Sequence, residues 1–235
     1  MDRVEGLTPD GAAAPGPSLD VGCGTGRVLL RALEAGLDMD GLDDSADMLE
    51  RLRTNAAARG LTPRVALADM RGFRMPRRYA CVMIPFNAFA HVLSSDDQVA
   101  TLRACHGHLL PGGRLTFDVF SATMEMLAAP VTEPVLELET VNPATGLKLR
   151  LYDGRRLDVD AQTQHSHIAI EELDERGQVA RTHRFVTLVR WTWPSEMDLL
   201  LRLAGFERRE ITGGFDGRPV AEHPGAIVVS AWRDG

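Results

Sequence analysis

The sequence has little of what several protein classes require. Its three cysteines, Cys23, Cys81 and Cys105, show no paired spacing and no C-x-x-C motif, which argues against a disulfide framework or a zinc site and suits a reducing compartment. No apolar run approaches the ~20 residues that span a membrane. The first residues carry acidic groups and no apolar segment, so no secretory signal is expected. These absences predict a cytoplasmic protein without a membrane partner and without a bound metal.

Basic residues are also in the minority. The chain has 26 lysines and arginines against 33 acidic residues, a net charge of -7, and Lys148 is its single lysine. Nucleic-acid affinity rests largely on basic side chains, so this balance argues against a nucleic-acid partner. At 235 residues and 44% hydrophobic content, the chain is long enough to bury a substantial core.

The most informative segment is the run from Asp20 to Gly26, with the sequence DVGCGTG. An apolar approach through Leu19 ends in an acidic residue and three glycines at alternate positions, and a helix-like stretch follows from Arg27 to Ala35. A dinucleotide fingerprint would read G-x-G-x-x-G, but Arg27 occupies the place of its third glycine. A carboxylate placed before the glycines favours a cationic ligand without phosphates.

This run resembles motif I of the class I S-adenosylmethionine-dependent methyltransferases, Asp/Glu-x-Gly-x-Gly-x-Gly. The turn Leu110–Gly113 before an apolar strand and the segment Gly41–Leu49 resemble the same family. The resemblance implies S-adenosyl-L-methionine as cofactor and an open α/β sheet that binds it beyond the strand ends. It assigns cofactor contacts in the glycine-rich turn to Asp20, Gly22, Cys23, Gly24 and Gly26.

Further cofactor residues are expected at the next strand ends. Residues 39–43 predict a second strand whose last residue, Asp43, lies about 20 residues beyond the glycine turn, where a ribose-binding acid belongs. A helix should follow, with Ser45 as its N-cap and Met48, Leu49 and Leu52 facing inward. The resemblance assigns the ribose hydroxyls to Asp43 and a cofactor contact to Met48. A solvated carboxylate that caps the next helix is the alternative for Asp43.

The third predicted strand, residues 64–68, ends in Asp69 and Met70. By the same resemblance, Asp69 accepts from the adenine amino group and Met70 offers its backbone amide. A strand-ending aspartate is common in any α/β protein, so the position in the series carries this assignment.

The fourth predicted strand, residues 79–85, ends at Pro85, which is also expected at the cofactor. The next segment, Asn87-Ala88-Phe89-Ala90-His91, resembles one that follows this strand in related bacterial enzymes, and it makes Asn87 and His91 the candidate catalytic residues. An imidazole titrates near neutral pH, so His91 could accept a proton. The alternatives are a turn-forming asparagine and a histidine that hydrogen-bonds the backbone. The segment does not match Asn/Asp-Pro-Pro-Tyr/Phe, which argues against DNA or glutamine substrates.

The predicted fold is a doubly wound, mostly parallel, seven-stranded Rossmann-like α/β sheet with an inserted antiparallel β lid. Residues 1–17 are expected to form a flexible arm, 18–121 and 194–235 the core, and 122–193 the lid. In the core, a helix should start at Ser94 or Ser95, and further strands should cover 114–120, 207–211 and 226–232. In the lid, Asp153-Gly154 predicts a hairpin turn and Glu175–Gly177 another. His165 and His167 share one strand face, and they are interpreted as two polar positions on the solvent side of a lid strand rather than as a pair that binds a metal or the substrate.

Together these patterns predict methyl transfer from S-adenosylmethionine to N or O of a small metabolite, such as a sugar or secondary metabolite. The alternatives are a nicotinamide-dependent oxidoreductase on a similar fold and a methyltransferase-like binding subunit without turnover. The expected partner is a small-molecule methyl acceptor, with the chain as monomer or homodimer.

Overall fold

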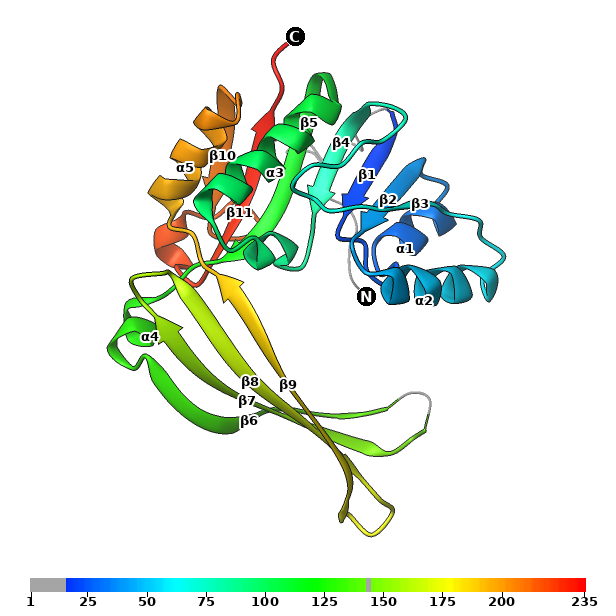
Figure 1. Ribbon diagram of the computed structural model, residues 1–235, viewed down its shortest axis with the longest axis vertical. Coiled ribbons are helices and arrows are strands. Elements are labelled where there is room, and N and C mark those ends of the chain that lie inside the picture. Colours follow the sequence, from blue (N-terminus) through cyan, green and yellow to red (C-terminus); the bar gives the residue numbers. More distant parts are fainter. Residues whose placement is uncertain (1–15, 143–144) are drawn as a thin grey trace. The chain divides into compact units, whose positions relative to one another are not determined.

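A computed structural model describes residues 16–142 and 145–235, and these form two compact units (Figure 1). The first comprises the chain up to residue 121 together with 192–235, and the second comprises residues 122–191. Most of the flexible arm predicted for residues 1–17 lies outside the described residues. Each unit is described separately below.

The first unit is built on a seven-stranded sheet with the order β10-β11-β5-β4-β1-β2-β3. Its strands are β1 (Ser18–Val21), β2 (Met39–Asp43), β3 (Arg64–Leu67), β4 (Tyr79–Ile84), β5 (Leu109–Phe120), β10 (Arg208–Thr212) and β11 (Ala226–Trp232). Its helices are α1 (Leu29–Glu34), α2 (Ala46–Ala57), α3 (Ser95–His108) and α5 (Pro194–Leu203), with short 3-10 segments η1 (Ala88–His91) and η2 (Val220–Glu222). Neighbours among β1 to β5 are parallel, and β11 runs antiparallel to β5 and β10. The predicted fold class is confirmed.

The central strands are apolar because both faces of a parallel sheet are covered. Every residue of β2 and every residue of β4 is buried. Ser45 and Ser94 are the N-caps of α2 and α3, and their hydroxyls accept from the N–H groups of Met48 and Asp97, as the sequence predicts. The Ser45 cap starts α2 two residues after β2 ends, whereas η1 lies between β4 and the Ser94 cap of α3.

Three local predictions were wrong. Helix α1 begins at Leu29 rather than Arg27, since residues 24–28 form turns. Strand β5 begins at Leu109, where Pro111–Gly113 was expected to separate helix from strand; a side chain at Gly113 would lie 3.0 Å from the carbonyl oxygen of Tyr79, so this glycine permits close strand approach. Met48 does not face inward: its side chain is 41% exposed in the first turn of α2.

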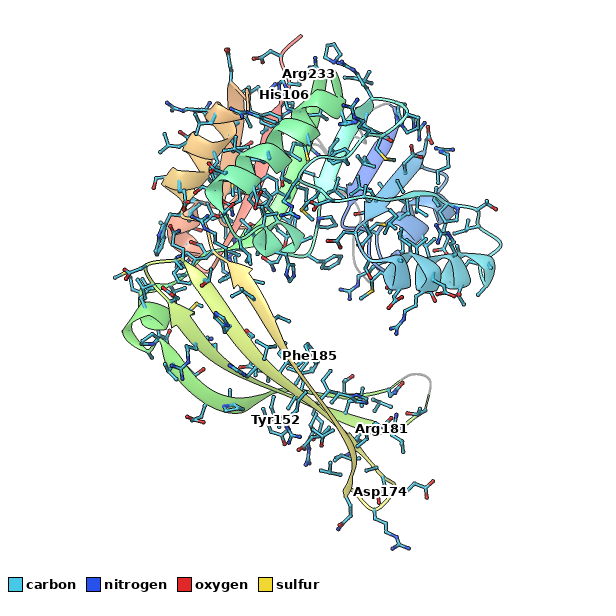
Figure 2. All side chains as sticks on the ribbon, in the orientation of Figure 1. His106, Tyr152, Asp174, Arg181, Phe185 and Arg233 are labelled. Atoms are coloured by element: carbon cyan, nitrogen blue, oxygen red, sulfur yellow. The ribbon has the colours of Figure 1, made fainter. Side chains whose placement is uncertain are left out.

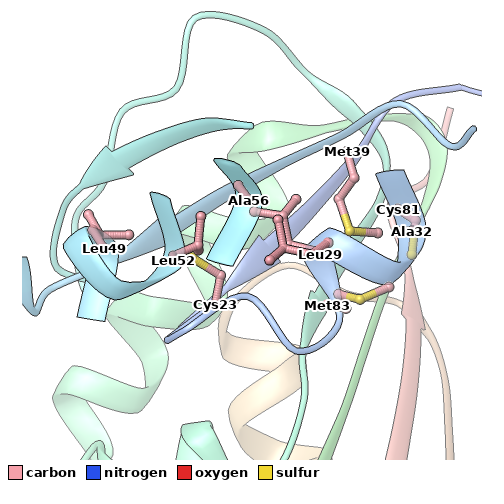
Figure 3. Packing of buried hydrophobic residues seen from close by; sticks show 10 residues of the cluster. Cys23, Leu29, Ala32, Met39, Leu49, Leu52, Ala56, Cys81 and Met83 are labelled. Atoms are coloured by element: carbon pink, nitrogen blue, oxygen red, sulfur yellow. The ribbon is translucent and has the colours of Figure 1, made fainter. Parts of the chain in front are cut away.

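A cluster of buried side chains packs α1 and α2 against the sheet (Figure 3). Leu29, Leu52 and Met39 are at most 1% exposed, and Cys23 joins them from the glycine turn. Burying a leucine stabilises the fold by about 1.5–3 kcal/mol. The turn that follows β1 is therefore anchored in the core by its own cysteine.

The second unit is a four-stranded antiparallel meander in the order β6-β7-β8-β9. It consists of α4 (Met124–Ala128), β6 (Val131–Val141), β7 (Lys148–Asp158), β8 (Thr163–Leu173) and β9 (Val179–Arg190). The turn predicted at Glu175–Gly177 is confirmed, and Gly177 there has φ +75°. The hairpin predicted at Asp153-Gly154 is wrong, because β7 runs straight through it. A Cβ at Gly154 would lie 2.8 Å from the Pro134 nitrogen, so this glycine allows β6 to approach β7 closely.

Candidate functional site

The glycine turn lies where the strand order of the sheet reverses. Strand β1 has β2 on one side and β4 on the other, and the chain passes from β1 into the turn at residue 22. Ligands of open α/β sheets bind beyond the carboxyl ends of the strands at this kind of position. The turn, the end of β2 and the end of β4 therefore delimit the candidate site.

Asp43 ties the glycine turn to the end of β2. Its Oδ2 accepts from the N–H of Gly24 at 2.8 Å, and its Oδ1 accepts from the N–H of Ser45 at 2.9 Å. A carboxylate oxygen can accept a second hydrogen bond, so both oxygens retain acceptor capacity for a ligand hydroxyl. The predicted helix-capping and ligand-binding roles of Asp43 are thus compatible.

Two of the glycines serve different purposes. A Cβ at Gly24 would meet no atom within 4 Å, so the backbone there borders open space and a ligand can approach it. A Cβ at Gly26 would lie 2.8 Å from Cγ of Leu30, so this glycine lets α1 pack closely. Both have positive φ, +52° and +90°, which glycine adopts without strain.

Asp20 carries the most unusual charge in the unit. It is 1% exposed, and within the described residues neither of its carboxylate oxygens has a partner in full hydrogen-bond geometry, although the N–H of Leu29 acts on it. Burial raises its pKa to about 7; the N–H of Leu29 opposes this rise and the carboxylate of Asp43 adds to it. Two acidic groups beside one glycine turn, one of them unpartnered, favour a positively charged ligand group at this place.

The ends of β3 and η1 meet at a cavity of about 260 Å³. Its lining includes Asp69, Met70 and His91, three of the residues singled out from the sequence, together with Arg71 and Asp97. Asp69 is exposed and held by Arg71, whose Nε lies 2.9 Å from both carboxylate oxygens, and this pairing lowers the pKa of Asp69. His91 therefore shares a cavity with the residues that the resemblance places at the adenine ring.

The segment after β4 forms a tight turn in an unusual conformation. Phe86 and Asn87 both have left-handed backbones, with φ of 59° and 58°, and the N–H of Ala88 donates to the carbonyl of Pro85. Both residues donate their N–H groups to the carboxylate of Asp118 on β5, at 2.8 and 3.1 Å. Hydrogen bonds from two amides to one carboxylate offset the strain of two left-handed residues.

This turn also touches the glycine loop. The guanidinium of Arg27 lies 4.4 Å from the centre of the Phe86 ring, and a Cβ at Gly22 would lie 3.2 Å from Cβ of Ala88. Sequence reasoning missed Asp118, although it is the one acidic residue in the apolar run of β5 and that exception was the available signal. It also missed the pairing of Arg27 with Phe86.

The remaining predicted site residues lie in varied surroundings. The Cys23 side chain is in the core, so only its backbone borders the turn, and its N–H donates to Leu42. Pro85 lies directly after β4 and Met48 at the start of α2. Within residues 16–142 and 145–235, no three His, Cys, Asp or Glu side chains gather as a metal site would require, and this covers His165 and His167. In the same residues, no helix is both long and apolar enough to cross a bilayer.

Comparison with known proteins shows which family this sequence and this geometry resemble. Residues 19–113 match a family model described as a methyltransferase domain. Over 97 residues the chain is 36% identical to a dTDP-3-amino-3,6-dideoxy-alpha-D-glucopyranose N,N-dimethyltransferase of Streptomyces fradiae, covering 40% of this chain and 36% of that protein. It is 34% identical over 102 residues to a glycine/sarcosine N-methyltransferase of Halorhodospira halochloris, covering 43% and 38%. These matches span well under half the length of either relative.

Similarity of structure extends further along the chain. The CcbJ methyltransferase of Streptomyces caelestis aligns with a TM-score of 0.79 at 27% identity, covering 95% of this chain and 85% of that one. A glycine turn open at Gly24, an unpartnered acid at Asp20 and acceptor capacity at Asp43 fit the positive charges and ribose of S-adenosyl-L-methionine. Residues 19–113 thus carry a methyltransferase domain, which confirms the resemblance to the class I S-adenosylmethionine-dependent methyltransferases.

Proposed function

We propose that the protein transfers a methyl group from S-adenosyl-L-methionine to a nitrogen atom of a small metabolite. The observation that carries this proposal is the buried, unpartnered carboxylate of Asp20 beside the glycine turn, because such a charge is stabilised by a cationic ligand. The names of the two sequence relatives above, both N-methyltransferases, favour nitrogen over oxygen. One substrate is an amino sugar and the other an amino acid, so a small amine is the proposed class.

The residues of the site divide into holding and positioning roles. When bound, the cofactor supplies an electrophilic methyl group on a positively charged sulfur. Asp43 accepts from the ribose hydroxyls, and Asp69 and Met70 contact the adenine ring after Asp69 loosens its pairing with Arg71. Asp118 and Arg27 fix the turn at Phe86 and Asn87, beside the glycine loop. Alignment of reacting groups supplies much of the acceleration, and a base is needed only for an amine that arrives protonated.

His91 has two possible roles, of which the shared cavity favours one. Because it lines the same cavity as Asp69 and Met70, we propose that it contacts the cofactor rather than the acceptor. His91→Ala should then weaken binding of S-adenosylhomocysteine. Slower turnover with unchanged binding would instead make it a proton acceptor.

Calorimetric titration of the purified chain with S-adenosylhomocysteine and with NADH tests the proposal. We expect micromolar binding of S-adenosylhomocysteine and no binding of NADH. In a separate assay, the labelled methyl group of S-adenosylmethionine should be transferred to amines. Binding of NADH without binding of S-adenosylhomocysteine would overturn the proposal in favour of the nicotinamide-dependent alternative. Binding of S-adenosylhomocysteine with no transfer to amines or alcohols would leave a methyltransferase-like binding subunit.

A further inference from the structure

The loop between β3 and β4 places one guanidinium among several carboxylates. Arg71, Asp69 and Asp97 line the cavity of about 260 Å³ described above, and their side chains are 52%, 45% and 43% exposed. Asp44 adds a third carboxylate to the same lining. An arginine keeps its charge at every physiological pH, so Arg71 is a permanent cation that these acids share.

In this structure Arg71 occupies Asp69 completely. Oδ1 of Asp69 accepts from the backbone N–H of Arg71 at 2.8 Å and from its Nε at 2.9 Å. Oδ2 accepts from the same Nε at 2.9 Å and from Nη2. An ionised carboxylate offers about four acceptor positions. Because all of them face donors of Arg71, a ligand amino group finds no vacant position on Asp69.

Asp43 differs from Asp69 in this respect. Each oxygen of Asp43 accepts one backbone N–H, from Gly24 or from Ser45, so each keeps an acceptor position for a ligand. The two acids at the ends of β2 and β3 are therefore in different states of readiness. Asp43 can receive ribose hydroxyls as it stands, whereas Asp69 must first be released.

A second position for the guanidinium exists in the same cavity. Nη1 of Arg71 lies 3.6 Å from Oδ2 of Asp97, which is an ion-pair contact longer than a direct charge-assisted hydrogen bond. Asp97 lies in the first turn of α3, where its backbone N–H donates to Oγ of Ser94 at 3.1 Å. A shift of about 1 Å towards Asp97 would replace the contact with Asp69 by a hydrogen bond of ordinary length.

The arginine at the other end of α3 has a different environment. Nη1 of Arg233 donates to the carbonyl oxygens of Leu109 and His106, at 2.8 and 3.3 Å, and Figure 2 labels His106 and Arg233 at this end of the helix. The last carbonyls of a helix lack partners within the helix, so Arg233 is a structural cap. Arg71 instead contacts acidic side chains that have a choice of partners.

We propose that Arg71 is a displaceable occupant of the adenine site, which holds Asp69 in the cofactor-free protein and moves to Asp97 when an adenine amino group replaces it. The proposal rests on the proposed function, since it takes S-adenosylmethionine as the ligand and Asp69 as the acceptor for its adenine. Arg71 then determines specificity, because a purine must donate a hydrogen bond to take its place. A purine with oxygen at position 6 has no donor there and leaves Asp69 paired with Arg71.

The first test is calorimetric titration of Arg71→Met with S-adenosylhomocysteine. Affinity should rise about two- to fivefold, since an exposed ion pair of this strength no longer has to be broken. Arg74→Met is the matched control, because it removes an exposed arginine of the same loop that does not line this cavity, and it should leave the affinity unchanged. A purely structural role for Arg71 predicts the opposite sign, because a loosened loop would bind the cofactor less tightly.

The second test uses S-inosylhomocysteine, in which oxygen replaces the adenine amino group. Its affinity should be lower than that of S-adenosylhomocysteine in the native protein and should gain less from Arg71→Met. Arg71→Lys serves should Arg71→Met fold poorly. A lysine carries the charge without the planar fork, so it should raise S-adenosylhomocysteine affinity by a smaller factor.

The third test examines the transfer to Asp97. Asp97→Asn should lower S-adenosylhomocysteine affinity about twofold in the native background, because the displaced guanidinium loses its second partner. In the Arg71→Met background the same change should have no effect. An equal loss in both backgrounds would overturn the transfer.

Three results separate this proposal from the proposed function. Equal or weaker S-adenosylhomocysteine affinity in Arg71→Met would overturn the displacement of Arg71, and so would an equal gain for S-inosylhomocysteine. Both leave cofactor binding by the native protein intact. Failure of the native protein to bind S-adenosylhomocysteine would refute the proposed function itself.

Discussion

The two units of this protein bury their strands to very different degrees. All residues of β2 and β4 in the first unit are buried, whereas ten of the eleven residues of β6 in the second are exposed. The first unit is therefore held by apolar packing on both sheet faces, and the second mainly by backbone pairing between long strands. The two units also differ in where their polar groups lie. Those of the first unit gather at strand ends, and those of the second lie along a sheet face.

The largest expected effect tests this difference in packing. Leu52→Ala, in the core beneath α2, should cost about 2–5 kcal/mol of unfolding free energy because it leaves a cavity. Leu138→Ala on β6, where the side chain is 52% exposed, should cost less than about 0.5 kcal/mol. Urea denaturation of both variants measures this contrast. Similar losses would show that the second unit has a comparably packed core.

The next effect concerns the tie between β2 and the glycine turn. Asp43→Ala removes the acceptors for Gly24 and Ser45 and the proposed ribose contact, so cofactor affinity should fall by about 1–3 kcal/mol. Calorimetry with S-adenosylhomocysteine measures the loss. Glu50→Gln, an exposed change on α2, is the matched control and should have no effect. Unchanged affinity in Asp43→Ala would remove its binding role.

Asp20 gives the first unit a pH dependence. Its pKa in the folded protein is raised to about 7, whereas in the unfolded chain the carboxyl ionises near pH 4. Between these two values the folded state holds a proton that the unfolded state has lost, so the stability of the cofactor-free protein falls as pH rises from about 4 towards 7. A bound cation favours the ionised form. S-adenosylmethionine affinity should therefore rise towards pH 7 by up to about tenfold per pH unit, ~1.4 kcal/mol, with release of a proton.

Calorimetric titrations between pH 5.5 and 8, in buffers of different ionisation heat, measure that proton. Asp20→Asn should abolish the release, weaken binding at pH 7 and stabilise the cofactor-free protein. A flat affinity profile in the native protein would show that Asp20 does not face the cation.

The smallest effect tests the turn after β4. Asp118→Asn keeps one acceptor oxygen for Phe86 and Asn87 where the carboxylate provides two, so stability should fall by about 1 kcal/mol. Hydrogen exchange at these two amides should accelerate in the variant. Glu210→Gln, an exposed change on β10, should leave both amides protected. Equal exchange in Asp118→Asn and the native protein would rule out Asp118 as the residue that fixes the turn.

Much of the first unit follows from local patterns. The strand that ends in Asp43 and the helix caps at Ser45 and Ser94 are visible in the sequence, because each signal spans a few neighbouring residues. Glycine at position 154 misled the turn prediction, since the sequence does not show whether a glycine is needed for a turn or for close contact with another strand. The prediction that Met48 faces inward was wrong. Its spacing from Leu49 and Leu52 is typical of the buried side of a helix, but in the first turn of α2 its side chain is exposed.

By itself, the sequence determined the class of the fold, the glycine turn and the family of the cofactor, because these depend on residue type and short spacing. Only the tertiary structure decided which polar groups lack partners and which residues far apart in the chain meet. The pairing of Asp118 with the amides of Phe86 and Asn87 spans about 30 residues, and the register of β7 with β8 decides which of their side chains share a sheet face. Register and burial arise from the packing of the whole chain, and a one-residue shift would place each side chain of a strand on the opposite face.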